Sequence, residues 1–288
     1  MRKEACHGEV DEKLYAWHNR FVFSVGCAQK YAVLISTNEV TADDTAIHSE
    51  WWYDLILQYK ILRENGFKDD KIYVLYGNGT DFATAHAAYN STTQFGHTIT
   101  NMAVNKANIQ SIFNTLKGKI TNKDYLYVWW MGHGGGSGPG SCNLSMSISN
   151  IGETVTDTEL STYINNVSNY KKRSVAVMTC HSGGMVDNMN TVGNKTATLT
   201  SSTCAQNSYD APSTCDGILH AEFNYTLPNA LRLKNPCGTA VGSDYDSNGY
   251  VSLSESHQYN TATMTSSTPQ MGDPDSIATT TYIKKDEP

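Results

Sequence analysis

Basic side chains are scarce in this sequence, and long apolar runs are missing. The 288 residues carry 21 Lys and Arg against 28 Asp and Glu, without a basic cluster that could follow a phosphate backbone. No apolar segment approaches the ~20 residues that a membrane span needs. We therefore expect no nucleic acid partner and no membrane-spanning helix, while the oligomeric state stays open.

Two kinds of short motif are also absent. Neither a Cys-x-x-Cys pair nor a zinc-type Cys/His spacing occurs, which disfavours a structural zinc. The His-Gly-Gly-Gly at 133–136 has no Gly-x-Ser-x-Gly partner, so a serine esterase of that type is excluded.

Setting Cys180 aside leaves six cysteines, which permit up to three disulfides. We predict an extracytoplasmic or secreted protein, the alternative being reduced, buried thiols.

Strand and helix patterns alternate along the chain. Short apolar or β-branched runs, typical of strands buried on both faces, occur at 31–37, 71–76, 124–131, 174–180 and 197–202. Helical patterns lie between or after them, at 49–66, 109–118, from the Thr156–Glu159 capping box onward, and at 220–234. This order predicts an α/β domain with a mainly parallel sheet and helices on both faces.

Two glycine-rich loops follow neighbouring strands of this sequence. Residues 132–140 come after the third strand, and residues 180–184 end the fourth. Such loops carry function in parallel sheets, and glycine lets the backbone approach a ligand closely. A lone Cys or His is usually structural. Here His133 and Cys180 stand together at strand ends, and an imidazole can activate a thiol, so we predict a catalytic pair.

The two loops resemble those of the caspase/legumain clan of cysteine peptidases, which place the catalytic His and Cys on neighbouring strand ends. The segments "YAVLISTN", "LRENGFKDDKIYVLY" and "SVAVMTC" are similar to the legumain (C13) family from Tyr31 to about Leu233, whereas Cys-His-Ser-Gly is more like the metacaspases. The resemblance implies a three-layer caspase-like fold. It also implies a cysteine endopeptidase, or a legumain-like transpeptidase, that acts on peptides or proteins without an organic cofactor.

The resemblance assigns roles to individual residues. It implies His133 as general base and acid, Cys180 as nucleophile, Gly134 as an oxyanion amide, and Asn38 as the residue that supports the histidine. Legumains carry an Arg-His pair after the first strand and Glu directly after the catalytic Cys, where this chain has Ile47-His48 and His181. Specificity for the cleaved bond therefore does not carry over.

A substrate pocket is expected beside the nucleophile. We place its wall within residues 199–211, which include Ser201 and Asp210. A carboxylate at Asp210 could anchor a basic side chain of the substrate. His181, directly after the nucleophile, is a further candidate for this pocket, although a hydrogen bond to the loop is its commoner role.

The segment "DYDSNGYVSLSE" matches a twelve-residue calcium loop. Its expected ligands stand at positions 1, 3, 5, 7 and 12 of the loop, namely Asp244, Asp246, Asn248, the carbonyl of Tyr250 and Glu255. Gly249 occupies position 6, where the loop turns sharply. An acidic turn without an ion seldom shares all these features, so we predict a structural calcium ion.

The domain organisation follows from these motifs. We expect an N-terminal extension at 1–30, a peptidase domain at 31–235, and a C-terminal segment at 236–288 that carries the calcium loop and packs on the same domain. A non-catalytic calcium-binding module that kept the fold is the alternative function. The intact His133 and Cys180 favour the enzyme.

Overall fold

A six-stranded sheet forms the centre of the protein in the computed structural model, which describes residues 28–38, 50–83, 85–136, 142–148 and 151–284. The strand order is β2-β1-β3-β7-β8-β9, and all pairs are parallel except β8 with β9. The strands are β1 (Lys30–Ser36), β2 (Ile72–Tyr76), β3 (Tyr125–Met131), β7 (Lys172–Met178), β8 (Thr196–Thr200) and β9 (Gln270–Gly272).

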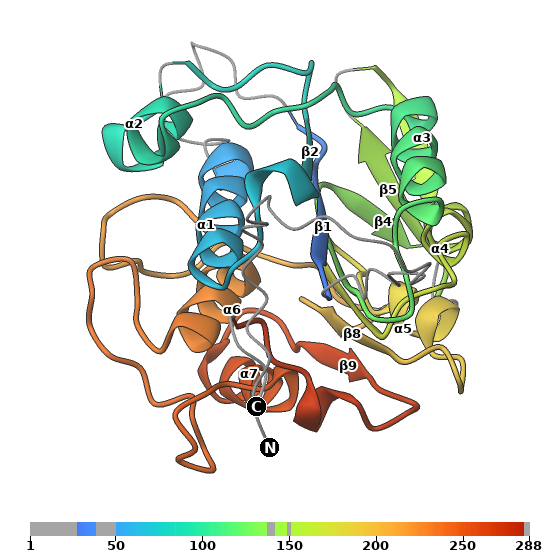
Figure 1. Ribbon diagram of the computed structural model, residues 1–288. Helices are drawn as coiled ribbons and strands as arrows, with labels where there is room; N and C mark the ends of the chain where they lie inside the picture. Colours follow the sequence, from blue (N-terminus) through green and yellow to red (C-terminus); the bar gives the residue numbers. More distant parts are fainter. Residues whose placement is uncertain (1–27, 39–49, 84, 137–141, 149–150, 285–288) are drawn as a thin grey trace, which may run out of the picture.

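Helices cover both faces of this sheet (Figure 1). One face carries α1 (Glu50–Glu64), α6 (Glu222–Arg232) and α7 (Leu253–Thr263); the other carries α3 (Lys106–Lys117), α4 (Asp157–Asn165) and α5 (Gly184–Met189). Alternate residues of β1 serve the two cores, since Leu34 belongs to the first and Val33 to the second. This confirms the three-layer α/β fold, because strands buried on both faces read as continuous apolar runs.

Local signals set most helix ends. The side chains of Thr156 and Glu159 form the expected capping box at α4, and α1 is followed by Gly66 in the left-handed region at φ 81°. The proposed cap Ser49 lies outside the described residues. Shorter helical turns are α2 (Ser91–Phe95), η1 (Asp69–Lys71), η2 (Ala87–Tyr89) and η3 (Ala278–Thr280).

A second, antiparallel sheet was not expected from the sequence. Its strands are β4 (Gly134–Gly136), β5 (Leu144–Ile148) and β6 (Glu153–Thr156), in the order β4-β5-β6. The glycine-rich stretch was predicted as a loop because three glycines carry no hydrophobic period. In β5 the buried residues alternate with more exposed ones, which is the pattern of a half-buried strand.

The C-terminal segment adds an edge to the central sheet. Strand β9 pairs antiparallel with β8, so that Met271 lies opposite Leu199. Strand β9 was not among the five strands predicted from the sequence, since three residues are too few for a periodic signal. Through β9 the segment after the peptidase motifs belongs to the same sheet as the candidate active site.

Two disulfides link described parts of the chain. They join Cys142 to Cys204 and Cys215 to Cys237, while Cys180 is a free thiol. Cys6 and Cys27 lie outside the described residues.

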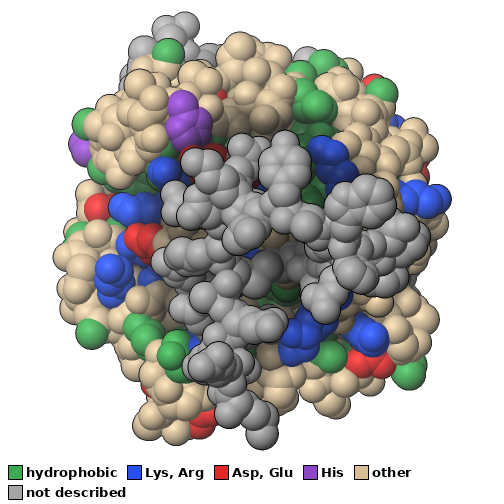
Figure 2. All heavy atoms as spheres, viewed as in Figure 1, with side chains coloured by type: hydrophobic (Ala, Val, Ile, Leu, Met, Phe, Trp, Pro, Cys, Tyr) green, Lys and Arg blue, Asp and Glu red, His purple; other side chains and the backbone are tan. Residues whose placement is uncertain are grey.

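No helix within the described ranges has the length and apolar character needed to cross a membrane. On the face shown in Figure 2, Lys and Arg side chains are spread out rather than gathered in one stripe.

Candidate active site

The register of the central sheet brings His133 and Cys180 together. Strands β3 and β7 are parallel neighbours, and their last paired residues are Met131 and Met178. His133 and Cys180 each stand two residues beyond that pair. Because paired strands lie about 4.8 Å apart, the equal offset places the two backbones side by side at the carboxyl edge of the sheet. Gly132 N donates to the Met178 carbonyl at 3.2 Å and keeps the two chains together past the strand ends.

His133 and Cys180 line the same cavity, which has a volume of about 250 Å³. Its other walls come from the end of β3, the end of β7, the start of α1 and two segments near residues 209 and 221. These residues are Glu50, Trp51, Met131, Gly132, Met178, Ser208, Tyr209, Asp210 and Ala221.

The surroundings of the two side chains differ. Cys180 is partly buried, and its thiol donates to the Ser208 carbonyl with the sulfur 3.7 Å from the oxygen. His133 is exposed, and its ring meets the edge of Trp51 with centroids 5.0 Å apart. The imidazole thus has solvent access for proton exchange, and Trp51 restricts its orientation.

Glycine is required at position 134 by the packing of the two loops. A Cβ atom there would lie 2.1 Å from Thr179 Oγ1 and 2.4 Å from the Cys180 carbonyl oxygen. No side chain can occupy that space, so only glycine lets the backbone after His133 run against the backbone of Cys180. This places the backbone at Gly134 against the backbone of Cys180, in the part of the site where an oxyanion amide would have to lie.

Asn38 stands on the far side of His133 from Cys180. Its strand β1 pairs with β3 so that Ser36 faces Met131, and Asn38 and His133 each follow that pair by two residues. Asn38 is buried and accepts a hydrogen bond from Thr37 Oγ1 at 3.3 Å. It does not line the cavity, so its place suits a residue that positions the histidine from behind.

His181 and Ser201 lie outside the cavity wall in which we expected them. The backbone of His181 is left-handed at φ 62°, its N–H donates to Gln206, and its Nδ1 lies 2.9 Å from the Cys204 carbonyl. Ser201 is buried, and its hydroxyl lies 2.5 Å from Ser208 Oγ. His181 therefore ties the loop that begins at Cys180 to the 203–206 segment, and Ser201 supports Ser208, which lines the cavity in its stead.

Asp210 lines the cavity, as expected, and a short pairing fixes its backbone. Residues 210 and 221 form an antiparallel bridge. Ala211 N donates to the His220 carbonyl at 2.8 Å, and Glu222 N donates to the Tyr209 carbonyl at 3.0 Å. Asp210 is therefore held by backbone hydrogen bonds on both sides although its side chain is exposed.

Glu50 and Trp51 are cavity residues that sequence reasoning missed. Both belong to the first turn of α1 and are 5% exposed. The signal that could have found them is topological, because a helix that follows a parallel strand begins at the carboxyl edge of the sheet. Ile47 and His48, which replace the legumain Arg-His pair, lie outside the described residues.

A buried charge cluster stands directly behind the cavity. His220 is fully buried, with Nδ1 2.6 Å from Asp54 Oδ1 and Nε2 3.4 Å from Asp216 Oδ2. The Tyr89 hydroxyl lies 2.9 Å from Nε2 and donates a short hydrogen bond to Asp216. Asp54 also accepts from Ala221 N at 3.1 Å. Since Ala221 lines the cavity, the cluster connects α1 to the wall of the site.

The charges of this cluster follow from burial and hydrogen bonding. Burial opposes the imidazolium of His220, but the hydrogen bonds to Asp216 and Asp54 outweigh it and raise the pKa of His220 to about 9. Burial raises the pKa of Asp54, and its hydrogen bonds to His220, Asn224 and Ala221 oppose that shift. We assign the shared proton to His220, because two carboxylates surround its ring.

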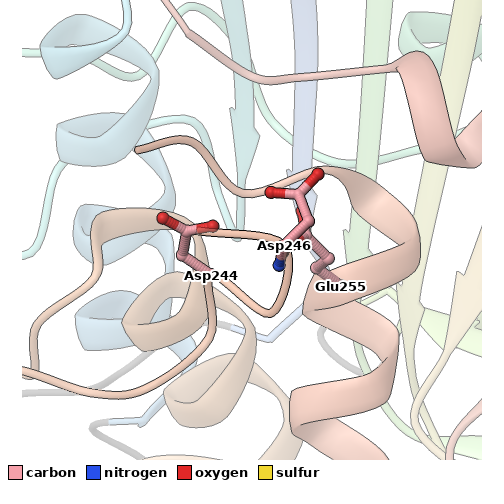
Figure 3. A group of neighbouring side chains, drawn as sticks. All are labelled: Asp244, Asp246 and Glu255. Atoms are coloured by element: carbon pink, nitrogen blue, oxygen red, sulfur yellow. Dashed lines mark hydrogen bonds between the residues drawn. The ribbon is translucent and has the colours of Figure 1, made fainter. Parts of the chain in front are cut away.

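The predicted calcium loop has the turn that such a site needs. The carboxylates of Asp244, Asp246 and Glu255 lie within 4.8 Å of one another, and Figure 3 shows Glu255 on the helix that follows the loop. Gly249 adopts φ 85°, and its N–H donates to Asp244 Oδ2 at 2.8 Å. The turn at position 6 thus directs the loop around its acidic groups.

Glu255 has a structural role in the same loop. One of its oxygens accepts from Tyr245 N and Asp246 N, at 2.9 and 3.2 Å. The other accepts from the backbone and side chain of Ser252, both at 2.8 Å. The residues fit a cation that prefers oxygen ligands. Bidentate binding by Glu255 would require its carboxylate to give up hydrogen bonds that it makes in this structure.

The fold and the two strand-end loops define the protein as a cysteine peptidase of the caspase-like clan. The profile of the peptidase C13 family matches residues 52–270, which include both loops. The chain belongs to this family, the legumain family of cysteine peptidases. Comparison of the whole sequence with curated proteins gave no match.

Proposed function

We propose that this protein hydrolyses peptide bonds as an endopeptidase in which His133 and Cys180 are the catalytic pair. The main support is their common offset beyond the Met131–Met178 pair and their shared place in one cavity. Cys180 is also the free thiol among the described cysteines, the other four of which form disulfides.

The first chemical stage forms an acyl-enzyme. The Cys180 thiolate attacks the carbonyl carbon of the substrate, forming a C–S bond and moving the carbonyl electron pair onto oxygen. The Gly134 amide donates to that oxyanion. When the carbonyl re-forms, the C–N bond breaks, and the His133 imidazolium protonates the departing amine.

The second stage releases the acid product. His133, now neutral, removes a proton from water, and the hydroxide attacks the thioester carbon. The C–S bond breaks, the carboxylic acid leaves, and the thiolate and imidazolium of the resting enzyme are restored. Asn38 acts in both stages by holding the histidine, for which its position beside His133 on the sheet edge is suited.

The pH dependence of hydrolysis tests the pair. We expect kcat/KM to rise and fall with pH, because acid protonates the thiolate and alkali removes the imidazolium proton that the amine needs. His133→Ala should lower kcat/KM by about 10²- to 10⁴-fold and abolish the alkaline limb. The measurement is a rate profile over pH 4 to 10 for both proteins. An unchanged profile in the variant would exclude His133 from proton transfer.

We also propose that the loop at 244–255 binds a structural calcium ion. Its ligands would be the side chains of Asp244, Asp246, Asn248 and Glu255 and the Tyr250 carbonyl. The acidic groups converge, the sharp turn at Gly249 is present, and Val251 at position 8 is buried in the domain. When bound, the ion would fix the start of α7 and with it the segment that leads to β9.

Calcium should therefore raise the melting temperature without taking part in catalysis. A hundredfold excess over Kd stabilises the folded state by about 2.7 kcal/mol. Asp244→Asn, at the first position of the loop where the pattern requires aspartate, should remove this calcium-dependent rise and leave peptide hydrolysis intact, whereas Glu255→Gln would also disturb the capping box. The control is Asp70→Asn, an exposed carboxylate outside the loop. The measurement is the melting temperature of each protein in calcium, in magnesium and in chelator. A wild-type melting temperature that does not change on chelation would refute the site.

We infer that the protein functions in an extracytoplasmic or secreted setting. Disulfides persist in oxidising compartments, and both bridges hold parts of the site. Cys204 belongs to the segment tied to His181, and Cys215 precedes Asp216 of the buried cluster. A reducing compartment would leave both segments without these links.

A further inference from the structure

The cavity beside the nucleophile combines acidic, aromatic and apolar groups. Two acidic residues, Glu50 and Asp210, line it together with the aromatic residues Trp51 and Tyr209. Met178 and Ala221 are among its apolar lining residues, and no Lys or Arg of the described residues lines it. Because Cys180 lines the same cavity, a substrate side chain next to the attacked carbonyl would enter this space.

We propose that this cavity selects a cationic side chain, arginine or lysine, on the amino side of the cleaved bond. Asp210 and Glu50 supply the negative charge that binds it. The proposal rests on the peptidase function proposed above and adds the substrate class. It also adds Glu50 as a specificity-determining residue.

The composition of the cavity matches the two parts of a long basic side chain. The aliphatic stem of arginine or lysine can lie against Met178 and Ala221, as such stems do on apolar surfaces. Its charged end is attracted by a carboxylate and by the faces of aromatic rings such as that of Trp51. An acidic substrate side chain would meet two like charges, which is a means of rejecting it.

Both carboxylates are held on fixed elements. Asp210 stands on a segment paired with residue 221, and Glu50 is the first described residue of α1. The helix N-terminus stabilises the ionised form of an acidic residue in its first turn. Glu50 is also 5% exposed, so a substrate cation reaching it would be largely removed from water, where charge pairing is stronger.

Matched peptides that differ only at the residue before the cleaved bond test the proposal. The series carries arginine, lysine, citrulline, asparagine or aspartate there. Citrulline keeps the shape of arginine but has no charge. We expect kcat/KM to be highest for arginine and lysine, and about 10- to 100-fold lower for citrulline.

Variants then assign the effect to the two carboxylates. Asp210→Asn and Glu50→Gln should each lower kcat/KM for the arginine peptide by about 10-fold or more, and lower it for the citrulline peptide by a much smaller factor. Asp70→Asn, which removes an exposed carboxylate outside the cavity, should change neither. An equal loss for both peptides in Asp210→Asn or Glu50→Gln would overturn that residue's role in recognising charge.

The outcomes separate this inference from the peptidase function itself. Equal or better cleavage of the asparagine peptide would overturn the cationic specificity and leave the peptidase standing. Cleavage of none of the peptides, together with failure of a peptidyl chloromethyl ketone to alkylate Cys180, would overturn the peptidase function and this inference with it. Intact mass of the protein, with Cys180→Ala as the blank, reports the alkylation.

Discussion

Replacing Cys180 with alanine should abolish peptide hydrolysis while the protein stays folded. Removal of a positioned nucleophile lowers turnover on the order of 10⁶-fold, because no other group can form the acyl intermediate. The stability cost is about 1 kcal/mol or less, since the side chain is only partly buried and its thiol donates a weak hydrogen bond to the Ser208 carbonyl.

A rate assay and a melting curve on the same samples separate the two effects. Cys180→Ser serves as a matched variant, because it keeps the size of the side chain and changes the nucleophile. Iodoacetamide should add one label at Cys180 of the wild type and none there in Cys180→Ala. Hydrolysis by the alanine variant at the wild-type rate would refute the mechanism, and loss of folding would show that the thiol is structural.

Asp54→Asn should destabilise the protein by about 3–5 kcal/mol, the cost of removing one partner of a buried ion pair. The carboxylate of Asp54 lies 2.6 Å from His220 and also accepts from the backbone of Ala221 and the side chain of Asn224. An asparagine can replace some of these hydrogen bonds but not the charge. Urea unfolding near pH 6 measures the difference, and Asp70→Asn should unfold as the wild type does.

The same cluster should make stability depend on pH. The pKa of His220 is about 9 in the folded protein and about 6.5 in an unfolded chain. A raised pKa stabilises the fold fully below about pH 6.5, and this contribution of about 3 kcal/mol is lost as pH rises through about 9. His220→Asn should flatten the decline between pH 6.5 and 9.5. A wild type equally stable at both ends of that range would mean that His220 is neutral in the core.

The main strands and the candidate catalytic pair could be predicted from the sequence because they depend on local signals. Buried parallel strands read as apolar runs, so the five runs match β1, β2, β3, β7 and β8 closely. The Thr156–Glu159 capping box is present as expected. His133 and Cys180 could be paired in advance, since residues that follow adjacent parallel strands meet at one edge.

The walls of the cavity were decided by tertiary structure. Glu50 and Trp51 on the one hand and Ala221 on the other come from two distant stretches of sequence, and only the packing of α1 and the 210–221 bridge brings them to Cys180. Ser201 and Ser208 look alike in the sequence, yet Ser201 is buried with its hydroxyl 2.5 Å from that of Ser208, and Ser208 lines the cavity. The edge strand β9 and the pairing of Asp54 with His220 are likewise long-range contacts, for which a local pattern carries no signal. Sequence alone thus determined the strands and the candidate pair of His133 and Cys180 at their ends, whereas the other side chains that line the cavity depend on distances that only the folded chain defines.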